Sequence, residues 1–263
     1  MMNRLASFFQ KQKDAGKKTL VGYLMAGDPD AETSLAVLRA ACKAGVDVLE
    51  LGVPFSDPTA DGAVIQAAAM RALAGGMNLS RALDLARRVR AEVETPIVLF
   101  SYYNPLLQYG LPKLGAALRQ AGVDGLLVVD LPPEESDELT QAYGGGLPLI
   151  RLIAPTTRAD RLQTIVQGAG GFLYLITRTG VTGGGALDPA SVARNAARVR
   201  QHSALPMCFG FGIHTAADIR ALAPLGDGVV VGSALVQAVA DAGNADAAVD
   251  AVTQKIRELR SGL

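Results

Sequence analysis

One glutamate, Glu50, lies within an apolar run that has the pattern of a β-strand. Residues 46–53 alternate as a β-strand does, so Glu50 shares a face with Val46 and Val48. A buried carboxylate without a partner is costly to ionise, so its pKa is expected to rise toward the range that serves proton transfer at neutral pH. Glu50 is therefore the first catalytic candidate.

Two aspartates follow this run in a polar segment. Asp61 comes eleven residues after Glu50, near the start of a predicted helix, and is either a second catalytic acid or a helix N-cap. Asp57 is either a site residue or a turn residue between Ser56 and Pro58. The pattern alone leaves both alternatives open.

Other common catalytic groups are missing from the strands. All seven lysines fall in predicted helices or outer loops, which disfavours Schiff-base chemistry. His202 and His214 are the only histidines, too few for a catalytic zinc site, and Cys42 and Cys208 lack the spacing of a metal knuckle or a disulfide framework. We expect general acid–base catalysis by carboxylates and no metal.

The elements that must position these acids alternate regularly along the chain. Near-continuous apolar runs, typical of parallel strands buried on both faces, cover residues 19–27, 46–53, 96–103, 124–132, 147–154, 171–177, 206–213 and 228–234. Helical spacing of apolar residues follows at 31–44, 80–93, 111–121, 134–143, 158–167, 189–202, 215–222 and 245–260.

Eight successive β–α units predict a single closed (β/α)8 TIM-barrel domain over residues 1–263. An open doubly wound sheet is the alternative, but residues 24–30 lack the G-x-G-x-x-G spacing of a dinucleotide site. Leu5, Phe8 and Phe9 suit an extra N-terminal helix that closes the bottom of the barrel. Residues 60–74 suit an extra helix after the second strand.

The carboxyl ends of barrel strands carry the active site. Glycine-bearing ends at 210–213 and 232–234 follow strands seven and eight, where such barrels commonly bind phosphate; tight turns are the alternative. The glycine-rich segment 178–186 after strand six is interpreted as a lid, or else as a connection without a role.

Composition excludes several classes. With 25 basic and 25 acidic residues and no tryptophan, the chain shows no footprint for nucleic acid. No apolar stretch approaches the roughly 20 residues of a membrane span, and the N-terminus does not resemble a signal peptide. A cytoplasmic protein is expected.

Taken together, these motifs resemble the α subunit of tryptophan synthase, nearly from end to end. The motifs that carry the resemblance are GDP at 27–29, ELGVPFSDPTADG at 50–62, YYNP at 102–105, DLP at 130–132, APT at 154–156, RTGVTG at 178–183, GFGI at 210–213 and GS at 232–233. The long second motif is highly specific.

The resemblance implies reversible retro-aldol cleavage of indole-3-glycerol phosphate to indole and glyceraldehyde 3-phosphate, the penultimate step of tryptophan biosynthesis, with no cofactor in this chain. In that family the acid matching Glu50 protonates indole C3 and helps to deprotonate the glycerol hydroxyl. The acid matching Asp61 binds the indole N–H and stabilises the cationic tautomer, which suits an aspartate that is more solvated and stays ionised.

The resemblance also assigns binding roles. Tyr102 and Tyr174 would border the indole pocket, and Thr182 on the closed lid would reach Asp61. Backbone amides would hold the phosphate at Gly183, Gly212, Gly232 and Ser233. Segment 54–60, with Pro54 and Asp57, and the lid, with Arg178, would face a β subunit that carries pyridoxal phosphate and receives indole in an α2β2 heterotetramer.

Thr59 and Ala63 depart from the Leu and Pro usual at these family positions, and Gly183–Gly184–Gly185 predicts a looser lid. Three other functions remain open at this point. They are a catalytically silent subunit that activates its partner, a sugar-phosphate isomerase on the same barrel, and a free-standing lyase that releases indole.

Overall fold

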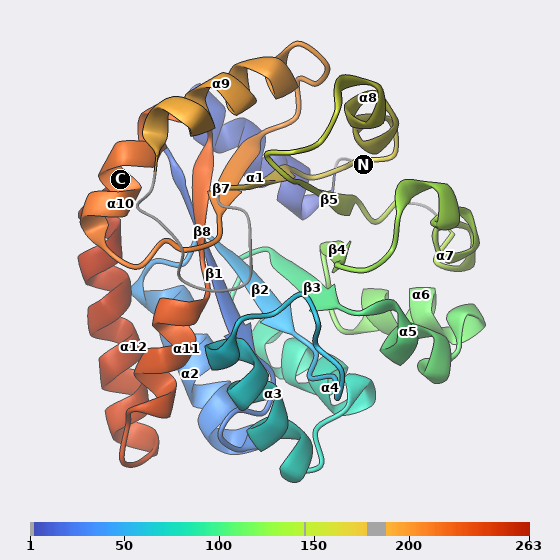
Figure 1. The fold of residues 1–263 in the computed structure, drawn as a ribbon. Coiled ribbons are helices and arrows are strands. Elements are labelled where there is room, and N and C mark those ends of the chain that lie inside the picture. The colour runs from blue at the N-terminus through green and yellow to red at the C-terminus, as the bar shows by residue number, and fades with distance from the viewer. Residues whose placement is uncertain (1–2, 145, 178–187) are drawn as a thin grey trace.

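The computed structural model describes residues 3–144, 146–177 and 188–263. Eight parallel strands form a closed barrel in chain order, and β8 completes the ring by pairing with β1 (Figure 1). The strands are β1 Thr19–Met25, β2 Val48–Gly52, β3 Ile97–Ser101, β4 Gly125–Val128, β5 Leu149–Ile153, β6 Leu173–Ile176, β7 Met207–Gly210 and β8 Gly228–Val231. The predicted (β/α)8 fold class is confirmed.

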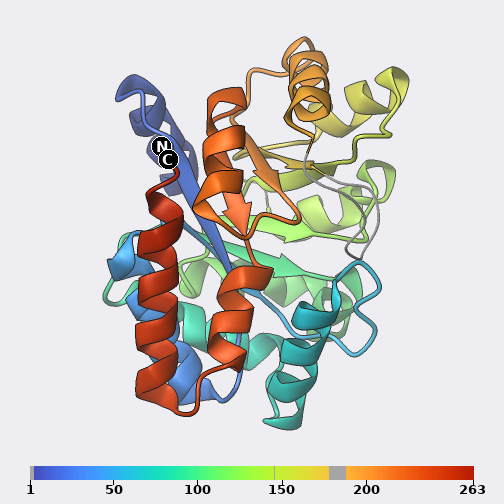
Figure 2. The same ribbon diagram turned by 60° about the vertical axis from the view of Figure 1, so that its left-hand side comes forward.

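The helices surround this barrel. They are α1 Arg4–Asp14, α2 Ala31–Ala44, α3 Ala63–Ala74, α4 Leu79–Arg90, α5 Tyr103–Tyr109, α6 Leu111–Gln120, α7 Asp137–Ala142, α8 Ala159–Gln167, α9 Pro189–Arg200, α10 Ala216–Leu222, α11 Ser233–Ala240 and α12 Ala245–Arg260, with 3-10 turns η1 Pro133–Glu135 and η2 Ala223–Leu225. Helices α11 and α12 pack against each other, and α12 also contacts α2, which joins the last β–α unit to the first (Figure 2). None of the described helices has the length and apolar character needed to cross a membrane.

Helix boundaries follow local signals. Asp30 caps α2 by accepting hydrogen bonds from the amides of Glu32 and Thr33, and Gly45 ends the helix in the left-handed conformation at φ 116°. The predicted bounds of α2 and α12 are those observed. Helix α5 was not predicted, because the apolar run of β3 continues into its short, seven-residue sequence and its N-cap residue, Tyr102, makes no capping side-chain bond.

Side chains of the strands divide between two cores, as strand alternation requires. Val48 belongs to the cluster inside the barrel, whereas Leu49 and Leu51 pack outward beneath the helices. Val46 was expected on the same face as Glu50 and Val48, and that assignment was wrong. Val46 precedes β2 and packs outside the barrel. Its side chain lies against Gly22 of β1, since a Cβ added to that glycine would be 2.7 Å from the Cγ2 atom of Val46.

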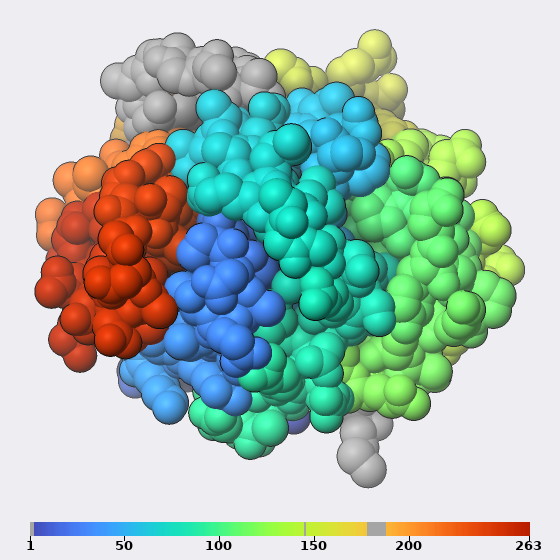
Figure 3. Space-filling view, turned by 90° about the horizontal axis from the view of Figure 1, so that it is seen from below, coloured from blue at the N-terminus to red at the C-terminus, as the bar shows by residue number. Residues whose placement is uncertain are grey.

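Helix α1 closes the bottom of the barrel, as predicted. Leu5 and Phe9 are buried in the inner cluster, and the Phe9 ring lies 5.5 Å from the ring of Phe172. The outer helices pack side by side around the strands, and Figure 3 shows α2, α3 and α11 forming one continuous face. A wide opening into the barrel lies at the carboxyl ends of the strands.

Three aspartates repeat one arrangement at the amino ends of the strands. Each directly precedes an even-numbered strand and accepts hydrogen bonds from an amide of the preceding strand and from the last arginine of a helix. The donors to Asp47 are Leu20 N (2.9 Å) and Arg260 (2.8 Å), those to Asp124 are Ile97 N (2.9 Å) and Arg90 (2.6 Å), and those to Asp227 are Met207 N (2.8 Å) and Arg200 (2.9 Å). These contacts tie helices to strands at the face opposite the opening, where barrels gain stability rather than activity.

Candidate active site

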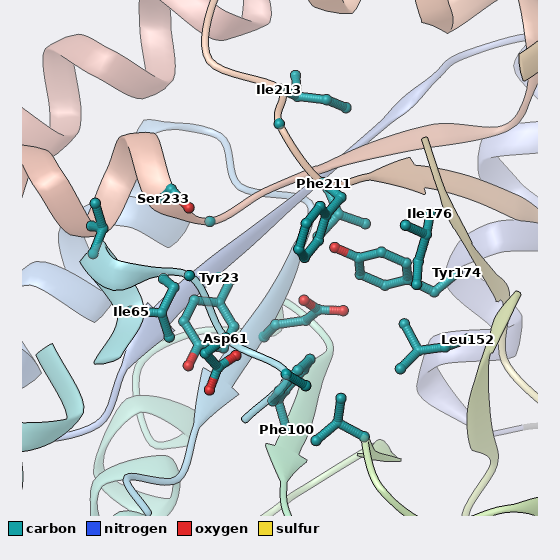
Figure 4. Close-up of a pocket in the computed structure, with 18 of the residues that line it drawn as sticks. Tyr23, Asp61, Ile65, Phe100, Leu152, Tyr174, Ile176, Phe211, Ile213 and Ser233 are labelled. Atoms are coloured by element: carbon teal, nitrogen blue, oxygen red, sulfur yellow. The ribbon is translucent and has the colours of Figure 1, made fainter. Parts of the chain in front are cut away.

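The opening at the carboxyl ends of the strands leads into a cavity of about 720 Å³. Its walls are largely apolar, and Figure 4 shows Tyr23, Asp61, Phe100, Tyr174 and Phe211 converging on it from different strands and loops. A mostly apolar cleft of this size with a few convergent polar groups has the usual properties of a small-molecule site.

Glu50 lies on the cavity wall near the middle of β2. The residue is 1% exposed, and its Oε1 atom has no hydrogen-bond partner. Burial raises the pKa of Glu50 to about 8, because the ionised form has lost its hydration without gaining a cationic neighbour. The side chain is therefore mostly protonated at neutral pH and can give up or accept a proton near that pH.

Asp61 lines the same cavity from the loop before α3. Burial raises its pKa to about 6, and the opposing effect is a hydrogen bond from the Tyr102 hydroxyl to Oδ2 at 3.2 Å. Asp61 was expected to be more solvated than Glu50, and it is half-buried whereas Glu50 is buried. With this pKa, about nine-tenths of Asp61 is still ionised at pH 7.

The N-cap alternative for Asp61 is wrong. Gly62 caps α3 and makes no side-chain capping bond, so the Asp61 carboxylate is not used by the helix. The Tyr102 hydroxyl holds this loop at two points, since it donates to Asp61 and accepts from the amide of Ala60 at 3.0 Å. Burial and the Asp61 charge raise the pKa of Tyr102, so its hydroxyl remains a donor.

Two tyrosines flank Glu50, and each lies over a glycine of the next strand. A Cβ added to Gly52 would lie 2.2 Å from the Tyr23 hydroxyl oxygen, and one added to Gly210 would lie 2.2 Å from that of Tyr174. Both glycines are needed because any larger side chain would displace a ring that forms the cavity wall. Burial, followed by the charges of the cavity acids, raises the pKa of both phenols, so both rings stay neutral.

The turns after β7 and β8 form another part of the cavity wall. Phe211 and Gly212 both adopt left-handed backbone conformations, at φ 86° and 74°, which turns the chain sharply after β7. Gly232 caps α11, and Ser233 begins it. Gly212, Gly232 and Ser233 all line the cavity. Free amides at the first turn of a helix form a favourable environment for an anion.

Comparison with known proteins places this site in a family. The model of the family described as tryptophan synthase alpha chain matches residues 9–262. The chain belongs to the tryptophan synthase alpha chain family. Relatives with that name are 53% identical in Desulfosudis oleivorans and 49% identical in Desulfatibacillum aliphaticivorans, each over 89% of this chain and 88% of the relative.

Solved structures agree with this assignment. The alpha subunit of tryptophan synthase from Legionella pneumophila superposes with a TM-score of 0.92 at 37% identity, covering 100% of this chain and 98% of that one. A chain of tryptophan synthase from M. tuberculosis in an aminoacrylate-bound form gives 0.88 at 31% identity, with 99% of both chains covered. As a tryptophan synthase alpha chain, the protein is a lyase of tryptophan biosynthesis that acts on indole-3-glycerol phosphate.

The structure brings most of the predicted alpha-chain site residues together. Glu50, Asp61, Tyr174, Gly212, Gly232 and Ser233 line the cavity. Tyr102 does not line it but lies behind Asp61 as a hydrogen-bond donor. Arg178, Thr182 and Gly183, with the rest of the predicted lid, lie outside the described residues.

The segment predicted to face a partner begins at the end of β2. Pro54 is buried, whereas Asp57 is exposed and accepts a hydrogen bond from the Ser56 hydroxyl at 2.6 Å. The amide of Thr59 donates to the Asp57 carbonyl at 2.9 Å, so Asp57 does occupy a turn. Ala63, the other departure from the family pattern, is the first residue of α3.

Three aromatic cavity residues were not among the predicted site residues. Tyr23 pairs directly with Glu50 across the β1–β2 register, and its ring packs edge-on against Phe100 with centroids 5.3 Å apart. Phe211 follows β7. Alternation along β1 could have indicated Tyr23, because it lies two residues after the inward-facing Val21. In the described ranges, no cluster of three or more His, Cys, Asp or Glu residues could bind a metal.

Proposed function

We propose that this chain cleaves indole-3-glycerol phosphate by a reversible retro-aldol reaction in which Glu50 transfers protons and Asp61 stabilises positive charge. The observation that carries the proposal is the presence of two carboxyl groups with different protonation states in one largely apolar cavity. A neutral acid beside an ionised one is the arrangement that acid–base catalysis at neutral pH requires.

The first step uses the proton held by Glu50. Its carboxyl group donates that proton to C3 of the indole ring, which leaves a cationic tautomer and a Glu50 carboxylate. The ionised Asp61 accepts a hydrogen bond from the ring N–H and lowers the energy of this cation. Because Tyr102 is hydrogen-bonded to Asp61, we assign it a positioning role for that carboxylate.

The second step returns the proton. The Glu50 carboxylate removes the proton of the glycerol hydroxyl next to the ring, whose O–H electrons form the aldehyde C=O bond. The C–C bond to indole C3 breaks, and its electrons restore the neutral aromatic ring. Indole and glyceraldehyde 3-phosphate are the products, and Glu50 is again protonated, so the cycle needs no cofactor in this chain.

The remaining cavity wall supports the assignment of the substrate ends. The apolar and aromatic side chains around Glu50 suit an indole ring, with Tyr174 on its border. The amides of Gly212, Gly232 and Ser233 suit the phosphate group. Gly183 would add a further amide, and Thr182 would reach Asp61 when the lid closes over the substrate.

Membership of this family implies a β-subunit partner. We propose an α2β2 heterotetramer in the cytoplasm, with residues 1–263 acting as one domain. The β subunit would hold pyridoxal phosphate and receive indole, while Pro54, Asp57 and Arg178 would lie on the side of the chain that faces it. The aminoacrylate-bound relative from M. tuberculosis is consistent with this division of chemistry.

The deciding experiment compares wild-type protein with the Glu50→Gln variant, which keeps the side-chain shape and loses the exchangeable proton. Turnover of indole-3-glycerol phosphate should fall about 100- to 10,000-fold, with an unchanged circular-dichroism spectrum. Wild-type turnover in the variant would refute the role of Glu50.

The same assay separates the alternative functions when a β subunit is added. Slow cleavage that accelerates with β supports a synthase α subunit, and fast cleavage without β indicates a free-standing lyase. Absence of cleavage under both conditions would favour a silent activating subunit. Turnover of isomerisable sugar phosphates in its place would indicate an isomerase.

A further inference from the structure

The balance of charge in the cavity is unusual for a site that receives a phosphate ester. Glu50 and Asp61 are both acidic, and both line the cavity that must also hold the phosphate group. Among the described residues that line the cavity, none is a lysine or an arginine, and His214 is the only side chain that can carry a positive charge.

His214 follows the turn that also bears the amide of Gly212. It lies two residues after Gly212, and both residues line the cavity. His214 is exposed and lines the cavity, so its imidazole can bind a ligand there without first breaking a buried contact. Ser233, at the first turn of α11, lines the same cavity.

The backbone that carries His214 is held firmly. The amide of His214 donates to Oδ2 of Asp218 at 3.0 Å, and Thr215 forms a reciprocal capping box with the same aspartate at the start of α10. Burial acts to raise the pKa of Asp218, but hydrogen bonds from His214 and Thr215 lower it, so Asp218 stays ionised. These bonds fix the backbone at the start of α10, which reduces the conformational cost of ordering this loop when a ligand binds.

We infer that His214 is a further substrate-binding residue, whose imidazole N–H donates a hydrogen bond to a phosphate oxygen of the substrate and of glyceraldehyde 3-phosphate. The inference rests on the proposed function, because it assigns a side chain to the phosphate end of that site. A side-chain N–H donor of this kind adds to the hydrogen bonds that backbone amides donate to the phosphate.

Kinetics in the synthetic direction can separate the two ends of the site, because indole and glyceraldehyde 3-phosphate are then independent substrates. His214→Ala should raise KM for glyceraldehyde 3-phosphate about five- to tenfold, a loss moderated by the exposure of the ring, and leave KM for indole unchanged. His214→Gln, which keeps a donor, should show a smaller increase of about two- to threefold. His202→Ala is the matched control, since His202 is also exposed and does not line the cavity.

A binding measurement independent of activity uses the same scarcity of histidine. With His202 and His214 as the only histidines, labelled protein gives two sets of imidazole NMR signals, which the variants assign. Titration with glyceraldehyde 3-phosphate should shift the His214 signals with the Kd found from kinetics and leave those of His202 in place. Saturable binding of glyceraldehyde 3-phosphate with static His214 signals, together with an unchanged KM in His214→Ala, would overturn the inference.

A third variant distinguishes failure of the inference from failure of the proposed function. A Cβ at Gly232 would enter the cavity wall 3.3 Å from Cβ of Tyr23, so Gly232→Ala should raise KM for glyceraldehyde 3-phosphate whatever His214 does. If Gly232→Ala has this effect and His214→Ala has none, the phosphate end stands and His214 has no part in it. If Gly232→Ala changes KM only for indole, the phosphate end itself is wrongly placed and the inference falls with it.

Discussion

Replacing Tyr102 by phenylalanine removes one hydroxyl and leaves the ring in place. In the wild type, this hydroxyl donates to Oδ2 of Asp61 at 3.2 Å and accepts from the amide of Ala60 at 3.0 Å. The hydrogen bond to Asp61 stabilises its ionised form and therefore lowers a pKa that burial has raised to about 6. Its loss must move the pKa of Asp61 further upward.

The size of this effect can be worked out from the bond. Hydrogen bonds to charged groups contribute about 1.5–3 kcal/mol, and the 3.2 Å separation is long for an O–H donor, so the low end applies. About 1.5 kcal/mol corresponds to roughly one pKa unit, which moves Asp61 from about 6 to roughly 7. The ionised fraction then falls about threefold at pH 6.5 and by only about a tenth at pH 8.

The assay is the pH dependence of kcat/KM for cleavage of indole-3-glycerol phosphate. Because the proposed mechanism needs ionised Asp61 and protonated Glu50, wild-type activity should rise through a pKa of about 6 and fall through one of about 8. Tyr102→Phe should shift only the acid limb, upward by about one unit.

Tyr103→Phe provides the matched control, because the Tyr103 hydroxyl bonds to the exposed Glu138 at 3.3 Å and does not touch Asp61. An acid limb that stays in place in Tyr102→Phe, or that moves equally in both variants, would refute the reasoning.

Two further predictions concern stability. The pKa of Glu50 is about 8 in the folded protein and 4.5 in the unfolded chain, so the folded state holds this proton more tightly. As pH rises between these values, the wild type should therefore lose stability relative to Glu50→Gln, by up to about 5 kcal/mol. Thermal unfolding should show the Tm difference widening from pH 5 to pH 8, and a constant difference would contradict the raised pKa. Asp124→Ala leaves Arg90 and the amide of Ile97 without their partner and should lower the free energy of unfolding in urea by about 3 kcal/mol. Glu94→Ala breaks only an ion pair whose carboxylate is 87% exposed and should cost less than about 0.5 kcal/mol; equal losses would show that the Asp124 contacts do not stabilise the barrel.

Much of the fold was predictable because its signals are local. The apolar runs located all eight strands, since parallel strands buried on both faces need such runs whatever surrounds them. The cap at Asp30 and the glycine at position 45 define α2 through contacts within a few residues. Helix α5 was not predicted, because its seven residues have no such cap and directly follow the apolar run of a strand.

The chemistry was predictable only in part. Alternation along β2 correctly grouped Glu50 with Val48, but only the closed barrel showed that their face is the inner one. The same grouping failed for Val46, because the strand had not yet begun there. Asp61 was ambiguous between a cap and a site residue, because both uses need the same residue at the start of a helix. The distinction depended on where α3 begins and on which side chain reaches the carboxylate.

By itself, then, the sequence determined the order of the strands and of most helices and placed an acid within the second strand, because spacing and capping act over a few residues. The tertiary structure decided how Asp61 is held, since its hydrogen-bond donor Tyr102 is 41 residues away in the chain. It also decided the proton affinity of Glu50, which depends on the side chains of several strands excluding water around one carboxyl group. Burial and long-range contact are properties of the closed barrel, and no local pattern contains them.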